Sequence, residues 1–170
     1  MNHFTEKTLE DLIFQNHSTI HQKGFEIMLN NIKRQYRLPS GKIVDLVTFE
    51  SDGDELMLYV IELKKGEVSA DTVSQAFGYY NELMFYLSET YKTIHHKIIL
   101  VGYEVMEIPL LDFLKGNIDI YKYNYDINGL SFELVSSTIQ LPDIYRINKG
   151  SQFMPKVPLT LIDQIEVSKN

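Results

Sequence analysis

Apolar and polar residues alternate between a helical and a strand period along the first hundred residues. Residues 5–16 carry apolar side chains at helical spacing, and Thr5 can cap the first turn, so we predict a helix there. Residues 24–31 predict a second, short helix. Residues 70 to about 91 keep a helical stripe of apolar side chains over several turns, which predicts a long helix.

The segments between these helices have the pattern of strands. IKRQYRLP, residues 32–39, is typical of an edge strand that ends at its proline. KIVDLVTFE (residues 42–50) and ELMLYVIELKK (residues 55–65) flank SDGD, which is a strong turn signal. KIILVG, residues 97–102, is a short continuous apolar run of the kind found in central strands. The order of helix, three strands, long helix and strand predicts the α/β class, with a central mixed sheet flanked by helices.

Beyond residue 102 the pattern predicts a short helix at residues 108–116 and a β-hairpin about Asn128 and Gly129. No repeat or linker divides the 170 residues, so we predict a single domain. Three tyrosines alternate along the first strand of this hairpin: Tyr121, Tyr123 and Tyr125. They could stack on nucleic-acid bases, but we expect them to pack against the long helix or a second subunit.

Composition and charge narrow the class of protein. Hydrophobic residues make up 44% of the chain and charged residues 23%, as in ordinary globular proteins. The absence of cysteine excludes a disulfide, a thiolate zinc site and a cysteine nucleophile. No apolar window approaches ~18 residues and no signal-peptide pattern is present, so we expect a cytoplasmic protein without a membrane span. The net charge of −7 argues against coating nucleic acid through a broad positive field, but not against a cation-loaded acidic site.

Two carboxylates are expected to face each other at one end of the predicted hairpin. If the strands are joined by a loop at residues 52–55, Asp45 falls opposite Glu62. Opposed carboxylates repel unless a cation or a proton lies between them. Mg²⁺ or Mn²⁺ would suit these two acids together with the backbone carbonyl of Leu63, with Lys64 beside the ion. The spacing is equally compatible with a plain hairpin in which Lys64 forms a salt bridge with an acid.

Polar residues on the two predicted helices are further candidates. Gln75 and Tyr79 lie four apart on one face of the long helix, away from its apolar stripe, where a solvated glutamine beside a half-buried tyrosine is the simpler interpretation. Glu6 and Glu10 share a face of the first helix. Glu6 lies nearer the centre of the apolar stripe, so we expect Glu6 at the border of the core and Glu10 on the surface.

Basic residues gather around the predicted edge strand, at Lys33, Arg34, Arg37 and Lys42. They could form a strip that contacts the DNA backbone. They could equally be solvated charges that keep an edge strand from pairing with another chain. The sequence leaves both open.

Several of these features, taken in order, resemble the PD-(D/E)XK nuclease superfamily. They are Asp45 on a strand after SGKIV, Glu62-x-Lys64 in IELKKG, and Gln75-x-x-x-Tyr79 in QAFGYY. The QxxxY element indicates the RecB-like branch, and residues 5–102 look most like the nuclease domain of NucS-type endonucleases. The proline in the superfamily's name is absent before the aspartate, where a valine stands, as is common in this branch.

The resemblance implies a restriction-endonuclease-like αβββαβ core at about residues 5–102, followed by an extension at residues 103–170 that contains the hairpin. It also implies that Asp45 and Glu62 bind Mg²⁺ or Mn²⁺ and that Lys64 positions or activates the attacking water.

Three further roles are carried over from the family. Glu6 matches the first-helix glutamate and would assist at the metal shell, and Gln75 with Tyr79 would orient the substrate phosphate or the catalytic lysine. The implied activity is a metal-dependent endonuclease acting on DNA in repair, restriction or phage-related processing. The alternative is a catalytically inactive module of this fold that binds DNA or a protein. For the nuclease, the choice of DNA substrate would depend on the extension, on homodimer formation or on a protein partner.

Overall fold

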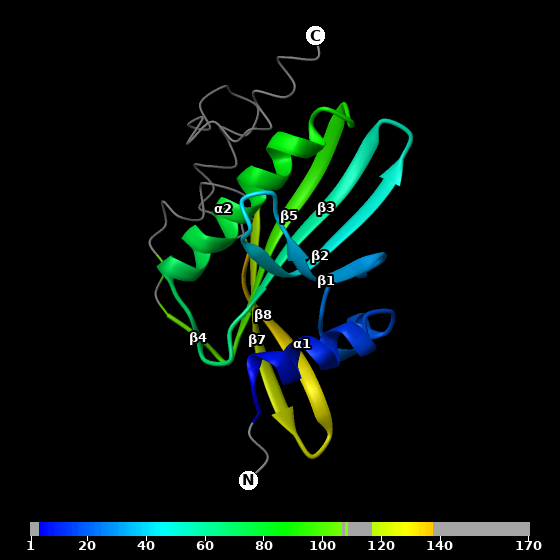
Figure 1. The fold of residues 1–170 in the computed structure, drawn as a ribbon. Helices are drawn as coiled ribbons and strands as arrows, with labels where there is room; N and C mark the ends of the chain where they lie inside the picture. The colour runs from blue at the N-terminus through cyan, green and yellow to red at the C-terminus, as the bar shows by residue number, and fades with distance from the viewer. Residues whose placement is uncertain (1–3, 107, 109–116, 138–170) are drawn as a thin grey trace, which may run out of the picture.

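The computed structural model describes residues 4–106, 108 and 117–137 of the chain. Six strands form one sheet in the order β1-β2-β3-β5-β7-β8, shown in Figure 1. Their bounds are β1 (Ile32–Arg37), β2 (Ile43–Asp52), β3 (Glu55–Leu63), β5 (Thr93–Gly102), β7 (Ile118–Asp126) and β8 (Gly129–Ser137). The β3–β5 and β5–β7 pairs are parallel and the others antiparallel. The predicted α/β class with a central mixed sheet is therefore confirmed.

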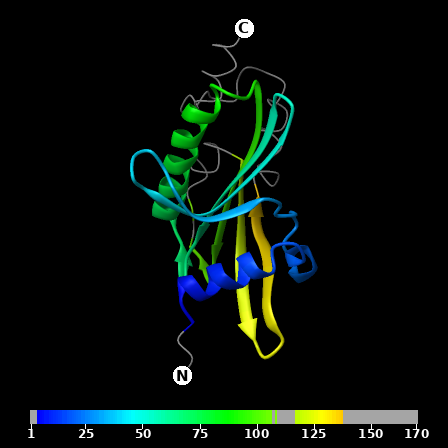
Figure 2. The same ribbon diagram turned by 45° about the vertical axis from the view of Figure 1, so that its right-hand side comes forward.

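Two helices cover the sheet, one on each face. Helix α2 (Ala70–Leu87) packs on one apolar cluster, and helix α1 (Glu6–Gln15) with the 3₁₀ turn η1 (Ile20–Lys23) packs on the other. The two ribbon views show α2 along the upper part of the sheet and α1 crossing nearer its lower end (Figure 1, Figure 2). Strands β4 (Glu67–Val68) and β6 (Glu104–Val105) form a separate parallel pair.

Strand β3 is buried on both faces. Val60 belongs to the cluster under α2 and Ile61 to the cluster under α1, and both are fully buried. This explains why its sequence is almost continuously apolar rather than alternating. Because both layers meet at this strand, side chains at its carboxyl end can contact elements of either face.

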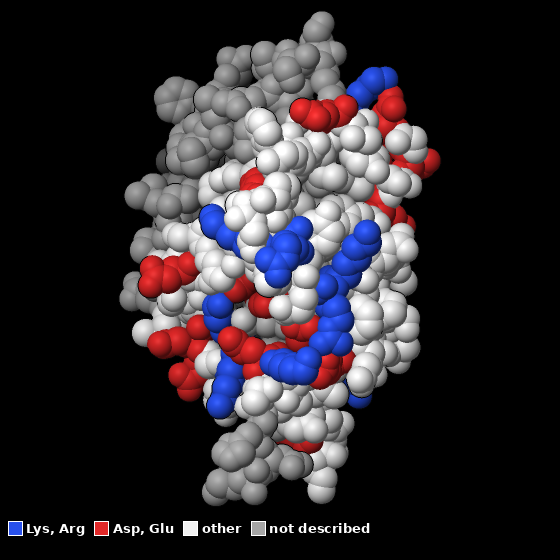
Figure 3. Space-filling model, viewed as in Figure 1, with Lys and Arg blue, Asp and Glu red and all other residues white. Residues whose placement is uncertain are grey.

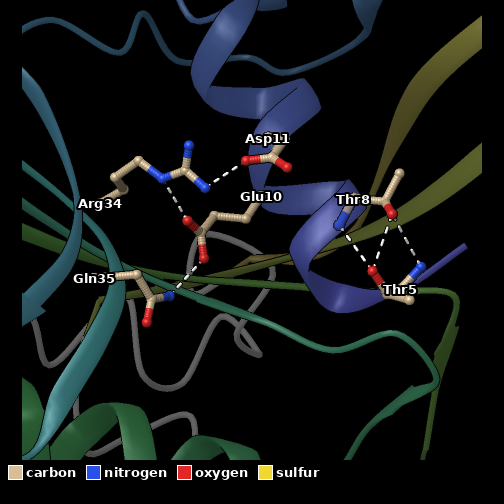
Figure 4. A network of polar contacts seen from close by, with 6 residues as sticks. All are labelled: Thr5, Thr8, Glu10, Asp11, Arg34 and Gln35. Carbon is tan, nitrogen blue, oxygen red and sulfur yellow. Dashed lines mark hydrogen bonds and ion pairs between the residues drawn. The ribbon is translucent and has the colours of Figure 1, made fainter.

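The boundaries predicted for α1 and α2 are close to those observed. Thr5 caps α1 and forms a reciprocal capping box with Thr8, as drawn in Figure 4. The predicted short helix at residues 24–31 is wrong, because the helical turn is η1, which ends at Lys23 and is capped by Gly24. Gly24 has a φ of 94°, and a Cβ there would lie 2.1 Å from the carbonyl oxygen of Phe132. Only glycine allows the chain to turn this closely against β8.

The hairpin of β7 and β8 forms, with Asp126 opposite Gly129 at its tip. It extends the central sheet, because β7 pairs with β5. Tyr121 and Tyr123 are buried on the α1 face, where Tyr121 stacks on Phe25 with ring centroids 4.3 Å apart. Of the two expected contacts, the one with the long helix is therefore wrong for these two tyrosines, and the one with a second subunit stays a prediction.

The predicted short helix at 108–116 lies outside the described residues, apart from residue 108. Within the described part of the chain, no helix has both the length and the apolar character that crossing a membrane requires.

Candidate active site

Asp45 lies at a break in the sheet, near the start of β2. The observed pairs run from Leu46 opposite Ile61 to Asp52 opposite Glu55. This is the register from which the sequence places Asp45 opposite Glu62. The half-buried Asp45 carboxylate accepts a hydrogen bond from the Leu63 N–H at 2.8 Å. Burial raises the pKa of Asp45, the bond from Leu63 and the charge of Lys64 oppose this rise, and nearby glutamates add to it.

Glu62 is the most strongly perturbed carboxylate of the site. Its residue exposure is 2%, and its Oε2 atom is buried without a hydrogen-bond partner among the described residues. Burial, followed by the negative charge of Asp45, raises the pKa of Glu62 from 4.5 to about 7, although Lys64 opposes the rise. The carboxyl end of β3 therefore holds a carboxyl group that ionises poorly unless more positive charge is supplied.

Lys64 joins this carboxylate to α2. Its ammonium donates to Glu62 Oε1 at 2.8 Å and to Gln75 Oε1 at 3.2 Å. Gln75 Nε2 in turn donates to the Tyr79 hydroxyl at 2.6 Å. Burial lowers the pKa of Lys64, but the bond to Glu62 and the surrounding carboxylates outweigh it, so the pKa is raised. The structure thus connects four predicted residues in one chain of contacts.

This arrangement corrects one expectation and matches one alternative. Tyr79 is only 7% exposed and belongs to the apolar cluster under α2, so it does not lie away from the apolar stripe as expected. The salt bridge between Lys64 and an acid, which the sequence left open, is formed with Glu62. It occupies one of the two Glu62 oxygens and leaves Oε2 without a hydrogen-bond partner in the described part of the chain.

The two glutamates of α1 are placed in the opposite way to that expected. Glu10 is 5% exposed and Glu6 is exposed. Glu10 accepts from Arg34 Nε at 2.6 Å and from Gln35 Nε2 at 2.5 Å, and Arg34 also pairs with Asp11 (Figure 4). Spacing on the helix could not show this, because the partners that bury Glu10 come from β1.

A hollow of about 240 Å³ adjoins Asp45 on the side of α1. Its lining consists of Glu6, Lys7, Glu10, Gln35, Asp45 and Leu63. In the space-filling view, acidic side chains gather in a depression of this face, with basic side chains on several sides of them (Figure 3). Glu6 also raises the pKa of Asp45 and Glu62, so its charge acts on both carboxylates. Lys7 and Gln35 belong to no recognisable sequence motif, so the sequence alone does not predict them as site residues.

The four basic residues of the predicted DNA-contacting strip differ in their environments. Lys33, Arg37 and Lys42 are exposed, and β1 is an edge strand as predicted. Arg34 is only half-exposed and its charge is already paired with Glu10 and Asp11, which counts against a contact with phosphate. For the three exposed residues, DNA contact stays a prediction.

The residues of the site include ligands that suit a divalent cation, but they do not form a complete set of ligands. Asp45 and Glu62 supply carboxylate oxygens, the ligands that Mg²⁺ and Mn²⁺ prefer. The unpartnered Glu62 Oε2 and the raised pKa values of both acids are the features that a bound cation would relieve. However, no three or more histidine or carboxylate side chains of the described residues are grouped to hold a metal ion. The Leu63 carbonyl, water or substrate would have to complete the shell.

Comparison with known proteins adds one structural likeness. No protein-family model matches the chain, and no curated protein matches it. A crystal structure of a repair endonuclease from Pyrococcus abyssi is 27% identical to this chain and covers 63% of it, with a TM-score of 0.44. The chain spans 41% of that protein. The function proposed for this chain therefore rests on its own site residues.

Proposed function

We propose that this chain is a metal-dependent deoxyribonuclease that hydrolyses phosphodiester bonds, with Asp45 and Glu62 as ligands of Mg²⁺ or Mn²⁺. The observation that carries the proposal is the Glu62 carboxyl group, which is buried beside Asp45, has one oxygen without a partner and has a pKa raised to about 7. Two acids in this position are unfavourable for a purely structural role. A cation held between them would stabilise the negative charge that develops on the phosphate during hydrolysis.

Lys64 is the residue that we propose as catalytic. Its ammonium is fixed at two points, by Glu62 and Gln75, and its side chain is 26% exposed. A fixed ammonium in a partly desolvated site can hold a water molecule or stabilise negative charge on a phosphate oxygen. Gln75, which is itself held by the Tyr79 hydroxyl, acts in this proposal by positioning Lys64.

The test is cleavage of end-labelled DNA by the purified protein. Single-stranded, duplex, flapped and mismatched DNAs are incubated with Mg²⁺, Mn²⁺ or EDTA. We expect cutting that requires the metal, and a loss of about 10²–10⁴-fold in rate for Lys64→Ala, the usual range for one positioned charged group. Lys65→Ala is the matched control, because Lys65 is exposed and its contact to Tyr123 is made by its backbone carbonyl.

The same experiment separates an enzyme from a binding module of this fold. Lys64→Ala leaves both carboxylates in place, so it should still bind DNA to within a few-fold in the presence of Ca²⁺ or Mn²⁺. If the wild-type protein binds DNA but cuts none of the substrates with either metal, and both lysine variants weaken binding equally, the lysines form only a phosphate-contacting patch. The nuclease proposal is then wrong.

A further inference from the structure

Gln35 has an unusual backbone conformation at the position of β1 that lies across from Asp45. Its φ is 47°, in the left-handed region that a Cβ atom disfavours. The residues on either side of Gln35 pair with those on either side of Asp45, but the ladder passes over these two. The pairing of β2 with β3 also begins only at Leu46. Asp45 therefore lies at a gap in the β1–β2 ladder and just beyond the end of the β2–β3 ladder.

The Gln35 side chain is held by α1. Its Nε2 donates to Glu10 Oε2 at 2.5 Å, while Glu10 Oε1 accepts from Arg34 Nε at 2.6 Å. Both oxygens of this buried carboxylate are thus engaged by two consecutive residues of β1 (Figure 4). A buried carboxylate that lost these partners would be left uncompensated, so the helix and the strand hold each other in place at this point.

The β2–β3 ladder ends at the pair of Leu46 and Ile61, and beyond this end the Leu63 N–H donates to the Asp45 carboxylate at 2.8 Å. Gln35, Glu10, Asp45 and Leu63 line the same hollow. We propose that Glu10 and Gln35 are positioning residues for Asp45: their hydrogen bond keeps Gln35 left-handed, which interrupts the β1–β2 ladder and directs the Asp45 carboxylate to Leu63. The importance of this positioning for catalysis rests on the proposed function, in which Asp45 is a metal ligand. The positioning itself can be measured without an assay of DNA cleavage.

The test is hydrogen exchange of the Leu63 amide, followed by NMR in the metal-free protein. Asp45→Ala gives the exchange rate without the acceptor. Gln35→Val disfavours the left-handed conformation, and Glu10→Ala removes the group that holds the Gln35 side chain. We expect both to speed Leu63 exchange by about tenfold or more. Lys33→Ala changes an exposed residue of β1 and leaves the bond between Glu10 and Gln35 in place, so it should stay within about threefold of the wild type.

The neighbouring amide shows whether a change at Leu63 is specific. The Lys64 N–H donates to the Val101 carbonyl at 2.8 Å, so its protection reports that the end of β3 is still folded. We expect it to be unchanged in Glu10→Ala. The positioning role is overturned if Leu63 exchanges as in the wild type in Glu10→Ala, or if both amides lose protection together. If Gln35→Val does not fold, the result for Glu10→Ala is sufficient to test the positioning role.

Failure of this inference and failure of the proposed function give different results. Specific loss of Leu63 protection in a protein that cuts no DNA upholds the positioning of Asp45 and refutes the nuclease. Metal-dependent cutting by Glu10→Ala at the wild-type rate, with Leu63 still protected, refutes the positioning and leaves the nuclease in place.

Discussion

Replacing Glu62 by glutamine should stabilise the metal-free protein at alkaline pH. The Glu62 side chain is 3% exposed, and its pKa is raised from 4.5 to about 7 by burial and then by the charge of Asp45. A carboxyl group that binds its proton more tightly in the folded than in the unfolded protein contributes stability below pH 4.5. That contribution is lost as the pH rises through about 7. One pKa unit corresponds to about 1.4 kcal/mol, so the shift amounts to roughly 3 kcal/mol at most.

Glutamine keeps the shape of the side chain, and its carbonyl oxygen can still accept from Lys64. It also removes the repulsion with Asp45. At about pH 8 in EDTA we therefore expect Glu62→Gln to be more stable than the wild type by about 1–3 kcal/mol, or roughly 2–10 °C in Tm for a chain of this size. At about pH 5 most of this difference should disappear, because the wild-type carboxyl is then protonated when folded.

The assay is urea or thermal unfolding of both proteins between about pH 5 and pH 8, with the difference between them as the measured quantity. The difference is needed because the lowered pKa of His96 makes the stability of both proteins fall below about pH 6.5. Addition of Mn²⁺ should stabilise the wild type in proportion to the logarithm of its concentration and should stabilise the variant much less. If Glu62→Gln is less stable than the wild type by the same amount at both pH values, the salt bridge with Lys64 is structural and the reasoning is refuted.

Three further changes test other parts of the structure. Asp45→Asn retains an oxygen for the Leu63 N–H, so metal-free stability should stay equal or rise while metal-dependent stabilisation is lost; a Tm lower by more than a few degrees would contradict this. Burial lowers the pKa of His96 to about 4, so the folded protein should lose stability as the pH falls from about 6.5 to 4. His96→Phe keeps an aromatic ring beside Tyr80 and should reduce that loss. Gly24→Ala should cost about 2 kcal/mol or more, because its φ is 94° and the new Cβ would meet a β8 carbonyl; urea unfolding with no shift in midpoint would contradict it.

The position of Asp45 relative to Glu62 could be predicted because it depends only on short-range rules. The side chains of a strand alternate with a period of two, and a tight turn fixes the register of its two strands. Once Gly53 is recognised as part of the turn, Asp45 opposite Glu62 follows by counting. The link from Lys64 to α2 could be anticipated only as a family feature, since no local rule says which face of a later helix will meet the strand.

The environment of the α1 glutamates could not be predicted for the same reason. The apolar stripe of α1 favours Glu6 as the more buried residue, but Arg34 and Gln35 of β1 reverse that order by binding Glu10. The failure at residues 24–31 is similar. Phe25 and Leu29 lie in an irregular segment, and both side chains are fully buried. Their spacing of four residues arises because each packs separately into the core, not because the segment is a helix.

The site lies at a strand end that is reached by contacts from both helices. Lys64 extends to Gln75 of α2, whereas the hollow beside Asp45 and Leu63 is lined by residues of α1. Because β3 is buried on both faces, charges at its end are poorly solvated, and each must be offset by a partner supplied by one helix layer or the other. Lys64 offsets one oxygen of Glu62 and the Leu63 amide offsets Asp45. No described residue of either layer offsets Glu62 Oε2, and this is where a cation would add most to the stability of the folded protein.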